Sequence, residues 1–191
     1  DYVSGDFNDG KLTIELDEIE AMDRSGMKAS QLKLYMPKGV FVEYETYILP
    51  LGLHGLNNNV KVISENAPIS VNNCDGDKHI ESENGPVRIH NSNGSIYARL
   101  ENGPLSAEAI SGEGIHVESE NGPIKLRLSN FKNVDLATEN GPIYYETQPV
   151  EGGEFKFRTE NGIVHLVLPL SFSFSLKAEL EIGRVKSKLD F

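Results

Sequence analysis

Glutamate recurs along this chain at a regular spacing. The resulting row of carboxylates is the feature of the sequence that could most clearly bind a ligand. Its members are Glu65, Glu83, Glu101, Glu120, Glu139 and Glu160, with a degenerate seventh copy at Glu181. Stacked on successive turns of one structure, they would form an outward row that could hold divalent cations or a basic partner. A solvated edge that prevents aggregation is the simpler interpretation, and the one we favour, because charge rows are usually solvated faces.

An asparagine follows each of these glutamates except the last. The set is Asn66, Asn84, Asn102, Asn121, Asn140 and Asn161. The alternation of apolar residues on both sides predicts that these side chains point inward. Buried amides must satisfy their donors and acceptors, which they can do by bonding one another and the turn backbone. We therefore predict a structural Asn ladder inside the fold, with ligand binding by these residues as the weaker interpretation.

The other residues with reactive side chains form no recognisable site. His79 and His116 are predicted to lie on one outer face with Tyr97 between them, too far apart to share a zinc ion. Cys74 is the only cysteine, which rules out an internal disulfide and favours a buried, idle thiol. We expect no catalytic, cofactor-binding or metal-binding residue.

The alternative is a carbohydrate-active β-helix enzyme, a polysaccharide lyase or glycosidase. Such an enzyme needs carboxylates that converge in a groove walled by long turns. The turns here are short, and Asp75, Asp77, Asp135 and Glu154 form no recognisable pair in the sequence. We therefore expect that the protein is not an enzyme.

The elements that position these residues follow from the repeat. Successive glutamates are 18, 18, 19, 19, 21 and 21 residues apart, which suits one coil of a solenoid. Each corner, such as Glu120-Asn121-Gly122-Pro123, lies between alternating apolar pairs such as Ile115/Val117 and Ile124/Leu126. This period of two predicts two short strands in each coil. The Gly is expected to adopt a conformation closed to β-branched residues, and the Pro to fix φ where the chain turns.

The predicted fold is all-β, a single-stranded right-handed parallel β-helix (β-solenoid) of seven to eight coils. The drift of the spacing from 18 to 21 argues against a left-handed hexapeptide helix. Residues 32–37 and 40–44 parallel a later pair of strands and are taken as an eighth, irregular coil. We expect an N-terminal cap over residues 1–30, with a strand at 11–16 and a helical turn at 17–22, and a β-solenoid over residues 31–191.

The amino-acid composition argues against two classes of binding partner. With 18 basic and 29 acidic residues the chain has a formal net charge of -11, which argues against binding nucleic acid or anionic lipid. No apolar stretch approaches the ~20 residues of a membrane span. The first residues carry no recognisable targeting signal, so we expect a mature or trimmed chain.

The repeated corners, the strand end at Leu166-Val167-Leu168-Pro169 and the later Gly183-Arg184-Val185 resemble the bacterial adhesin family of β-solenoid domains. The resemblance covers about residues 31–189. It implies a single-chain β-solenoid, frequently exported or envelope-associated, with no established catalytic residues.

We expect a non-catalytic, adhesin-like binding or scaffold domain of the cell surface or envelope, outside the cytoplasm, with a protein or glycan ligand and no cofactor. The chain finishes at Leu189-Asp190-Phe191 with no obvious cap. An uncapped last coil predicts weak end-to-end association into a homo-oligomer.

Overall fold

The computed structural model describes residues 3–8, 11–16, 35, 37–147 and 152–169. The chain divides into two compact units, Asp1–Met36 and Pro37–Phe191. The first contains an antiparallel hairpin of β1 (Val3–Asn8) and β2 (Lys11–Leu16). Strand β2 is the strand predicted for residues 11–16, whereas the helical turn predicted for 17–22 lies outside the described residues.

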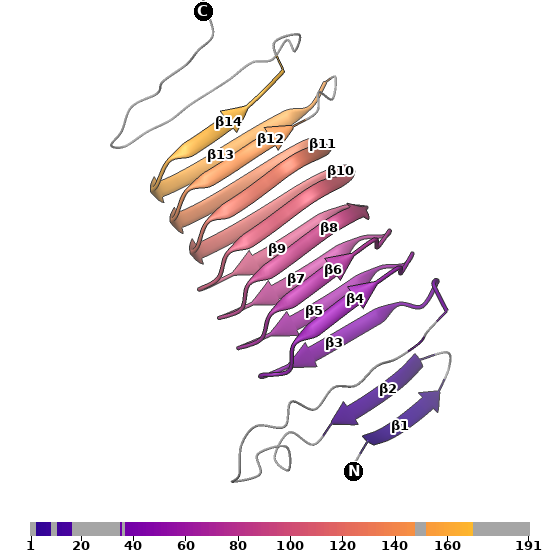
Figure 1. The fold of residues 1–191 in the computed structure, drawn as a ribbon. Coiled ribbons are helices and arrows are strands. Elements are labelled where there is room, and N and C mark those ends of the chain that lie inside the picture. Colours follow the sequence, from indigo (N-terminus) through magenta and orange to yellow (C-terminus); the bar gives the residue numbers. More distant parts are fainter. Residues whose placement is uncertain (1–2, 9–10, 17–34, 36, 148–151, 170–191) are drawn as a thin grey trace, which may run out of the picture. The chain divides into compact units, whose positions relative to one another are not determined.

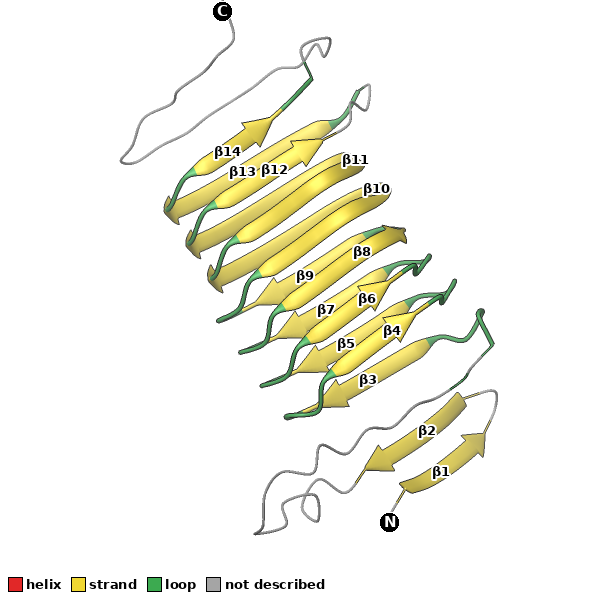
Figure 2. Ribbon diagram, viewed as in Figure 1, coloured by secondary structure: helices red, strands yellow, loops and turns green. Residues whose placement is uncertain are grey.

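The second unit is a parallel β-solenoid, as predicted, and about six turns of it are described. Its strands form two layers that run in opposite directions (Figures 1 and 2). Face A contains β3 (Val42–Thr46), β5 (Val60–Ser64), β7 (Lys78–Ser82), β9 (Ile96–Leu100), β13 (Glu154–Asn161) and the second parts of β10 (Leu105–Asn121) and β11 (Ile124–Asn140). Face B contains β4 (Leu51–His54), β6 (Ile69–Asn72), β8 (Val87–Asn93), the first parts of β10 and β11, β12 (Ile143–Thr147) and β14 (Val164–Val167).

Equivalent residues of successive coils pair directly. Val60 pairs with Lys78, which pairs with Ile96 on face A, and Ile69 pairs with Val87 on face B. The described part of the chain contains no helix, and so none that could cross a bilayer.

The core lies between the two faces and is built from the apolar columns. Val62, Ile80, Ala98, Val117 and Leu136 are buried on face A, each between two more exposed neighbours. On face B the same alternation buries a column that ends in Tyr145. Burial of these columns from water is the main stabilising term expected for such a stack.

The asparagines lie on the outside, so their predicted inward orientation is wrong. Glu83 and Asn84 are both exposed, while Ser82 and Gly85 on either side are buried. Two consecutive outward residues reverse the alternation, because the corner is a turn and the period of two holds only within strands. The amides still bond one another: each Asn from Asn84 onward donates Nδ2 to Oδ1 of the Asn one coil earlier, at 2.9–3.0 Å.

The corner positions need glycine because a side chain there would overlap the preceding coil. The prediction that these glycines adopt a special backbone conformation is wrong. None of Gly85, Gly103 and Gly122 has a positive φ. A Cβ on Gly103 would lie 2.4 Å from the carbonyl oxygen of Gly85, and one on Gly122 would lie 2.3 Å from that of Gly103. The coils therefore touch backbone to backbone at this corner, an approach that only glycine permits.

One coil differs from the sequence prediction. Strand β3 overlaps the predicted strand at 40–44, but its partner in the same coil is β4, which we did not predict. Thr46 and Pro50 stand one repeat before Ser64 and Pro68, and this period could have revealed the corner although Tyr47 and Ile48 replace its Glu and Asn. Residues 32–34 and the last copy at Glu181 lie outside the described residues.

Candidate binding groove

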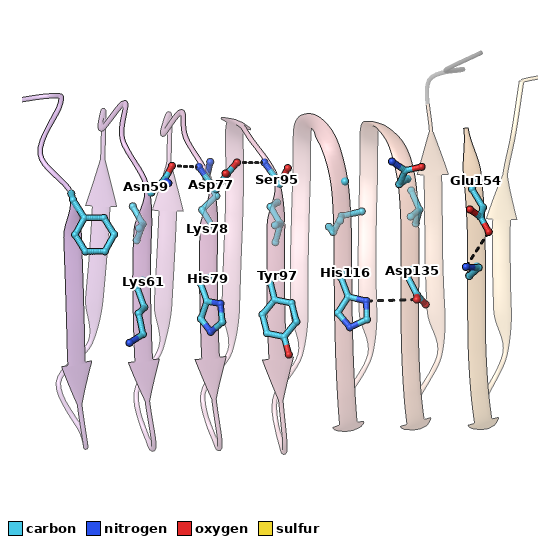
Figure 3. A pocket seen from close by; sticks show the side chains of 18 residues that line it. Asn59, Lys61, Asp77, Lys78, His79, Ser95, Tyr97, His116, Asp135 and Glu154 are labelled. Atoms are coloured by element: carbon cyan, nitrogen blue, oxygen red, sulfur yellow. Dashed lines mark hydrogen bonds and ion pairs between the residues drawn. The ribbon is translucent and has the colours of Figure 1, made fainter. Parts of the chain in front are cut away.

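One outward position of each coil on face A forms a continuous line, which we call the face A strip. Its residues are Lys61, His79, Tyr97, His116, Asp135 and Lys156, paired in register from β5 to β13. Figure 3 shows the labelled members side by side on neighbouring strands. They point outward because the residues on both sides, such as Ile96 and Ala98, point into the core.

The centre of the strip is a stack of three rings. The ring centroids of His79 and Tyr97 are 4.8 Å apart with planes at 18°, and those of Tyr97 and His116 are 5.3 Å apart at 15°. Strand spacing of about 4.8 Å places flat side chains at this separation. The rings therefore cover one another's faces and turn their edges, which carry the nitrogens and the hydroxyl, to solvent.

Carboxylates hold the two imidazoles. Nε2 of His79 lies 2.8 Å from Oε1 of Glu81. Nε2 of His116 lies 3.3 Å from Glu118, and its Nδ1 lies 3.6 Å from Asp135. The other oxygen of Asp135 contacts Arg158 at 3.2 Å. These contacts fix the ring orientations before any ligand arrives.

A groove of about 690 Å³ follows the strip. Its second side consists of the residues just before the face A strands, Asn59, Asp77, Ser95, Gly114 and Asn133. The amide of Asp77 donates to Oδ1 of Asn59 at 2.9 Å, and that of Ser95 donates to Oδ1 of Asp77 at 2.8 Å (Figure 3). This side of the groove is thus tied from coil to coil.

Lysine side chains at the two ends of the groove are paired with glutamates. Nζ of Lys61 lies 2.9 Å from Glu43, and this hydrogen bond raises the pKa of Lys61. Nζ of Lys156 lies 3.0 Å from Glu154. The groove therefore has little uncompensated charge.

Lys78 lies beneath the groove and is buried, which is unusual for a lysine. Its Nζ donates to the carbonyl oxygens of Cys74, Gly76 and Asn93 at 2.8, 2.7 and 2.6 Å. Burial lowers the pKa of this amine. All three N–H bonds of the ammonium are engaged, so Lys78 stabilises the turn and is not available to a ligand.

The residues singled out in the sequence differ in exposure and lie in different parts of the structure. The glutamates of the row from Glu65 to Glu160 are exposed, and Glu181 lies outside the described residues. Within the described ranges no group of three or more His, Cys, Asp or Glu is close enough to hold a metal ion. Cys74 is buried, as predicted, and its thiol donates to the carbonyl of Asn72 at 3.2 Å.

The groove itself is what sequence reasoning missed. Asp77, Asp135 and Glu154, which form no pair in the sequence, all line it. The repeat does place His79, Tyr97 and His116 in one outer column. We considered this column only as a zinc site, for which the two histidines are too far apart, and did not consider contact between the rings. The useful signal was three ring side chains at consecutive outward positions, since the coil spacing brings such rings into contact.

Comparison of the chain with protein-family models, curated proteins and solved structures gives no match.

Proposed function

We propose that this chain is a non-catalytic, adhesin-like binding domain of the cell surface or envelope, outside the cytoplasm, whose protein or glycan ligand lies along the groove of face A. The observation that carries the proposal is the stacked His79–Tyr97–His116 centre within an elongated groove. The resemblance to bacterial adhesin domains supports the location.

The groove has the properties of a preformed recognition surface. The strip residues are accessible, with exposed side-chain fractions of 43% for His79 and 35% for His116. Ring stacking and carboxylate contacts restrain them, so little side-chain entropy is lost on binding. Donors and acceptors converge at its edges, as they do in sites that recognise polar ligands.

A carbohydrate-active enzyme is the second candidate, and His116 is the observation that favours it. This imidazole contacts both Glu118 and Asp135, and such a group could move a proton during cleavage of a glycosidic bond. A binding domain needs only the contacts, whereas an enzyme also needs an activated nucleophile or a second acid–base group at the reacting bond.

A single experiment separates the two candidates. The whole chain is immobilised, and extracellular proteins and polysaccharides are passed over it while the eluate is assayed for new reducing ends and unsaturated sugars. We expect retention of a ligand without new ends, and weaker retention by His116→Ala. Turnover that His116→Ala abolishes would establish the enzyme, and absence of any retained ligand would remove the binding proposal.

The proposal includes the finer architecture expected from sequence. We expect right-handed coils, because crossover connections between parallel strands have that hand. We also expect seven to eight coils in all, a cap formed by residues 1–30, and weak end-to-end association. Sedimentation velocity over a range of concentrations tests the last point, and a monomer at the highest concentration would contradict it.

A further inference from the structure

We propose that the ligand of the groove is an extended, uncharged, β-linked polysaccharide that lies along the solenoid axis with one sugar against each coil. The inference rests on the proposed binding function and specifies its ligand class. It is carried by the spacing of the strip, by its balanced charge and by the polar groups in and beside the groove.

The spacing favours a sugar chain over a peptide. Neighbouring coils present equivalent side chains about 4.8 Å apart, and one sugar of an extended β-linked chain advances by nearly that distance. An extended peptide presents same-face side chains about every 6.6–6.8 Å, so it loses register with the coils within two steps. A chain with one sugar per coil places the hydroxyls of successive sugars beside successive positions of the strip, Lys61, His79, Tyr97, His116, Asp135 and Lys156.

The charge of the strip favours an uncharged chain. Lys61, Lys156 and Arg158 are each within 3.2 Å of a carboxylate oxygen. A polyanion would have to displace these carboxylates, and the net charge of -11 repels it at long range. A polycation would have to displace the side chains of Lys61, Lys156 and Arg158 from the same carboxylates.

The polar groups beside the face A strip suit hydroxyl groups of a ligand. Glu81 and Glu118 each contact one imidazole nitrogen, and a carboxylate has about four lone-pair sites. Their remaining lone pairs can accept hydrogen bonds from neighbouring hydroxyls of a sugar, and the Tyr97 hydroxyl can donate or accept. At one end of the groove Phe41 is 52% exposed, and its ring can pack against the apolar face of a terminal sugar.

The test uses the whole chain and isothermal titration with β-linked glucose oligomers of graded length. Comparators are α-linked glucose oligomers, galacturonic acid oligomers and an uncharged extended peptide. Affinity for the β-linked series should rise with length and level off at about six sugars, the number of coils in the strip. Binding should change little with salt, because no net charge is neutralised.

Two variants compare the faces of the solenoid. Tyr97→Ala removes the centre of the ring stack and should weaken binding about tenfold. Tyr144→Ala removes the same side chain from face B, where Tyr144 packs against His165, and should leave affinity within about twofold. Circular dichroism and melting curves establish that both variants are folded.

The outcomes separate this inference from the proposed function. Preference for the peptide, salt-sensitive binding of the galacturonic acid oligomers, affinity independent of length, or equal losses in both variants overturns the neutral glycan but leaves a binding domain. Cleavage of the oligomers overturns the proposed function itself. Absence of binding to the β-linked series overturns the inference, and the ligand screen described above then decides the function.

Discussion

The solenoid has two edges that solve the same problem, reversal of the chain between faces, in different ways. At the corner edge, formed by the Glu-Asn-Gly-Pro segments, equivalent residues near the start of the face A and face B strands are nine positions apart throughout the described coils, as in Val60 to Ile69 and Val134 to Ile143. At the turn edge, where each face B strand leads to the next face A strand, the separation grows from nine positions (Ile69 to Lys78) to twelve (Ile143 to Phe155). All changes in repeat length thus fall on the turn edge.

The two edges share one contact and differ in another. Corner glycines such as Gly103 touch the backbone of the preceding coil, and turn-edge glycines such as Gly94 and Gly112 do the same. In the longer coils the turn edge also buries the side chains of Ile110 and Phe131, where β10 and β11 continue through the edge as single strands. The turn edge therefore accommodates extra residues around buried side chains while keeping backbone contact between coils.

The groove borders the adaptable edge. Asn59, Asp77 and Ser95 belong to the turn edge and form one side of the groove. The corner edge keeps one length from coil to coil, whereas the length of the turn edge varies next to the proposed site.

The largest effect is expected for Gly103→Ala. The new Cβ would lie 2.4 Å from the Gly85 carbonyl oxygen, so the corner must open and the paired strands must shift. We expect a loss of about 3 kcal/mol in the free energy of unfolding, measured by urea denaturation. Gly52→Ala in β4 is the matched control, because no atom lies within 4 Å of its Cβ position; equal losses in both would show that the corner contact is unimportant.

Lys78→Met tests the turn edge. Without the ammonium, three carbonyl oxygens lose their donor, and we expect a loss of about 2 kcal/mol in the free energy of unfolding. Lys61→Met, which removes an exposed ammonium, should leave it almost unchanged.

The stability difference between the original chain and Lys78→Met should depend on pH. Burial lowers the pKa of Lys78 below 10.5 in the folded chain, so at pH values approaching 10.5 the unfolded chain binds more protons. The stability contributed by this group is therefore present above the unfolded pKa and is lost as pH falls through the folded pKa. Relative to Lys78→Met, the original chain should gain stability as pH rises toward 10.5; a flat difference would show that the three hydrogen bonds cancel the effect of burial.

Asn102→Ala tests the ladder of the corner edge. The change removes two exposed hydrogen bonds, one that Asn102 donates to Asn84 and one that it accepts from Asn121. It should lower the free energy of unfolding by about 1 kcal/mol. Glu101→Ala, at the exposed neighbour, should cost nothing or stabilise slightly by relieving repulsion along the glutamate row. Millimolar calcium should leave the melting temperature of the original chain unchanged; a rise lost in Glu101→Ala would establish the row as a cation site.

The smallest effect is expected for Leu128→Asn at the turn edge. Gly55, Asn73, Asn91, Ala109 and Leu128 occupy equivalent positions, all with positive φ. Leu128 has a φ of 49° and is 43% exposed, so Asn should relieve backbone strain and raise the free energy of unfolding by about 0.5 kcal/mol. Gly55→Ala should lower it by about 1 kcal/mol through strain alone, and a gain there would contradict the assignment of strain to this column.

Much of the fold could be predicted because the strands repeat. The alternation of Ile115 with Val117 and of Ile124 with Leu126 places strands on both faces correctly, and β2 coincides with its predicted range. The orientation of the asparagines could not be predicted by extending this alternation through the corner, where two residues in succession face outward. The candidate site was predictable only in part, since His79, Tyr97 and His116 were assigned to one outer column without recognition of their stacking.

By itself, the sequence determined the number of residues in each coil and which aliphatic side chains are buried, because hydrophobic burial acts on a pattern that can be read locally. The tertiary structure alone decided what lies between coils: the requirement for glycine at the corner, the carbonyl cage of Lys78, the contact between stacked rings and the groove beside them. Each of these features includes contacts between residues 15 or more positions apart, and such contacts exist only once the coils have stacked.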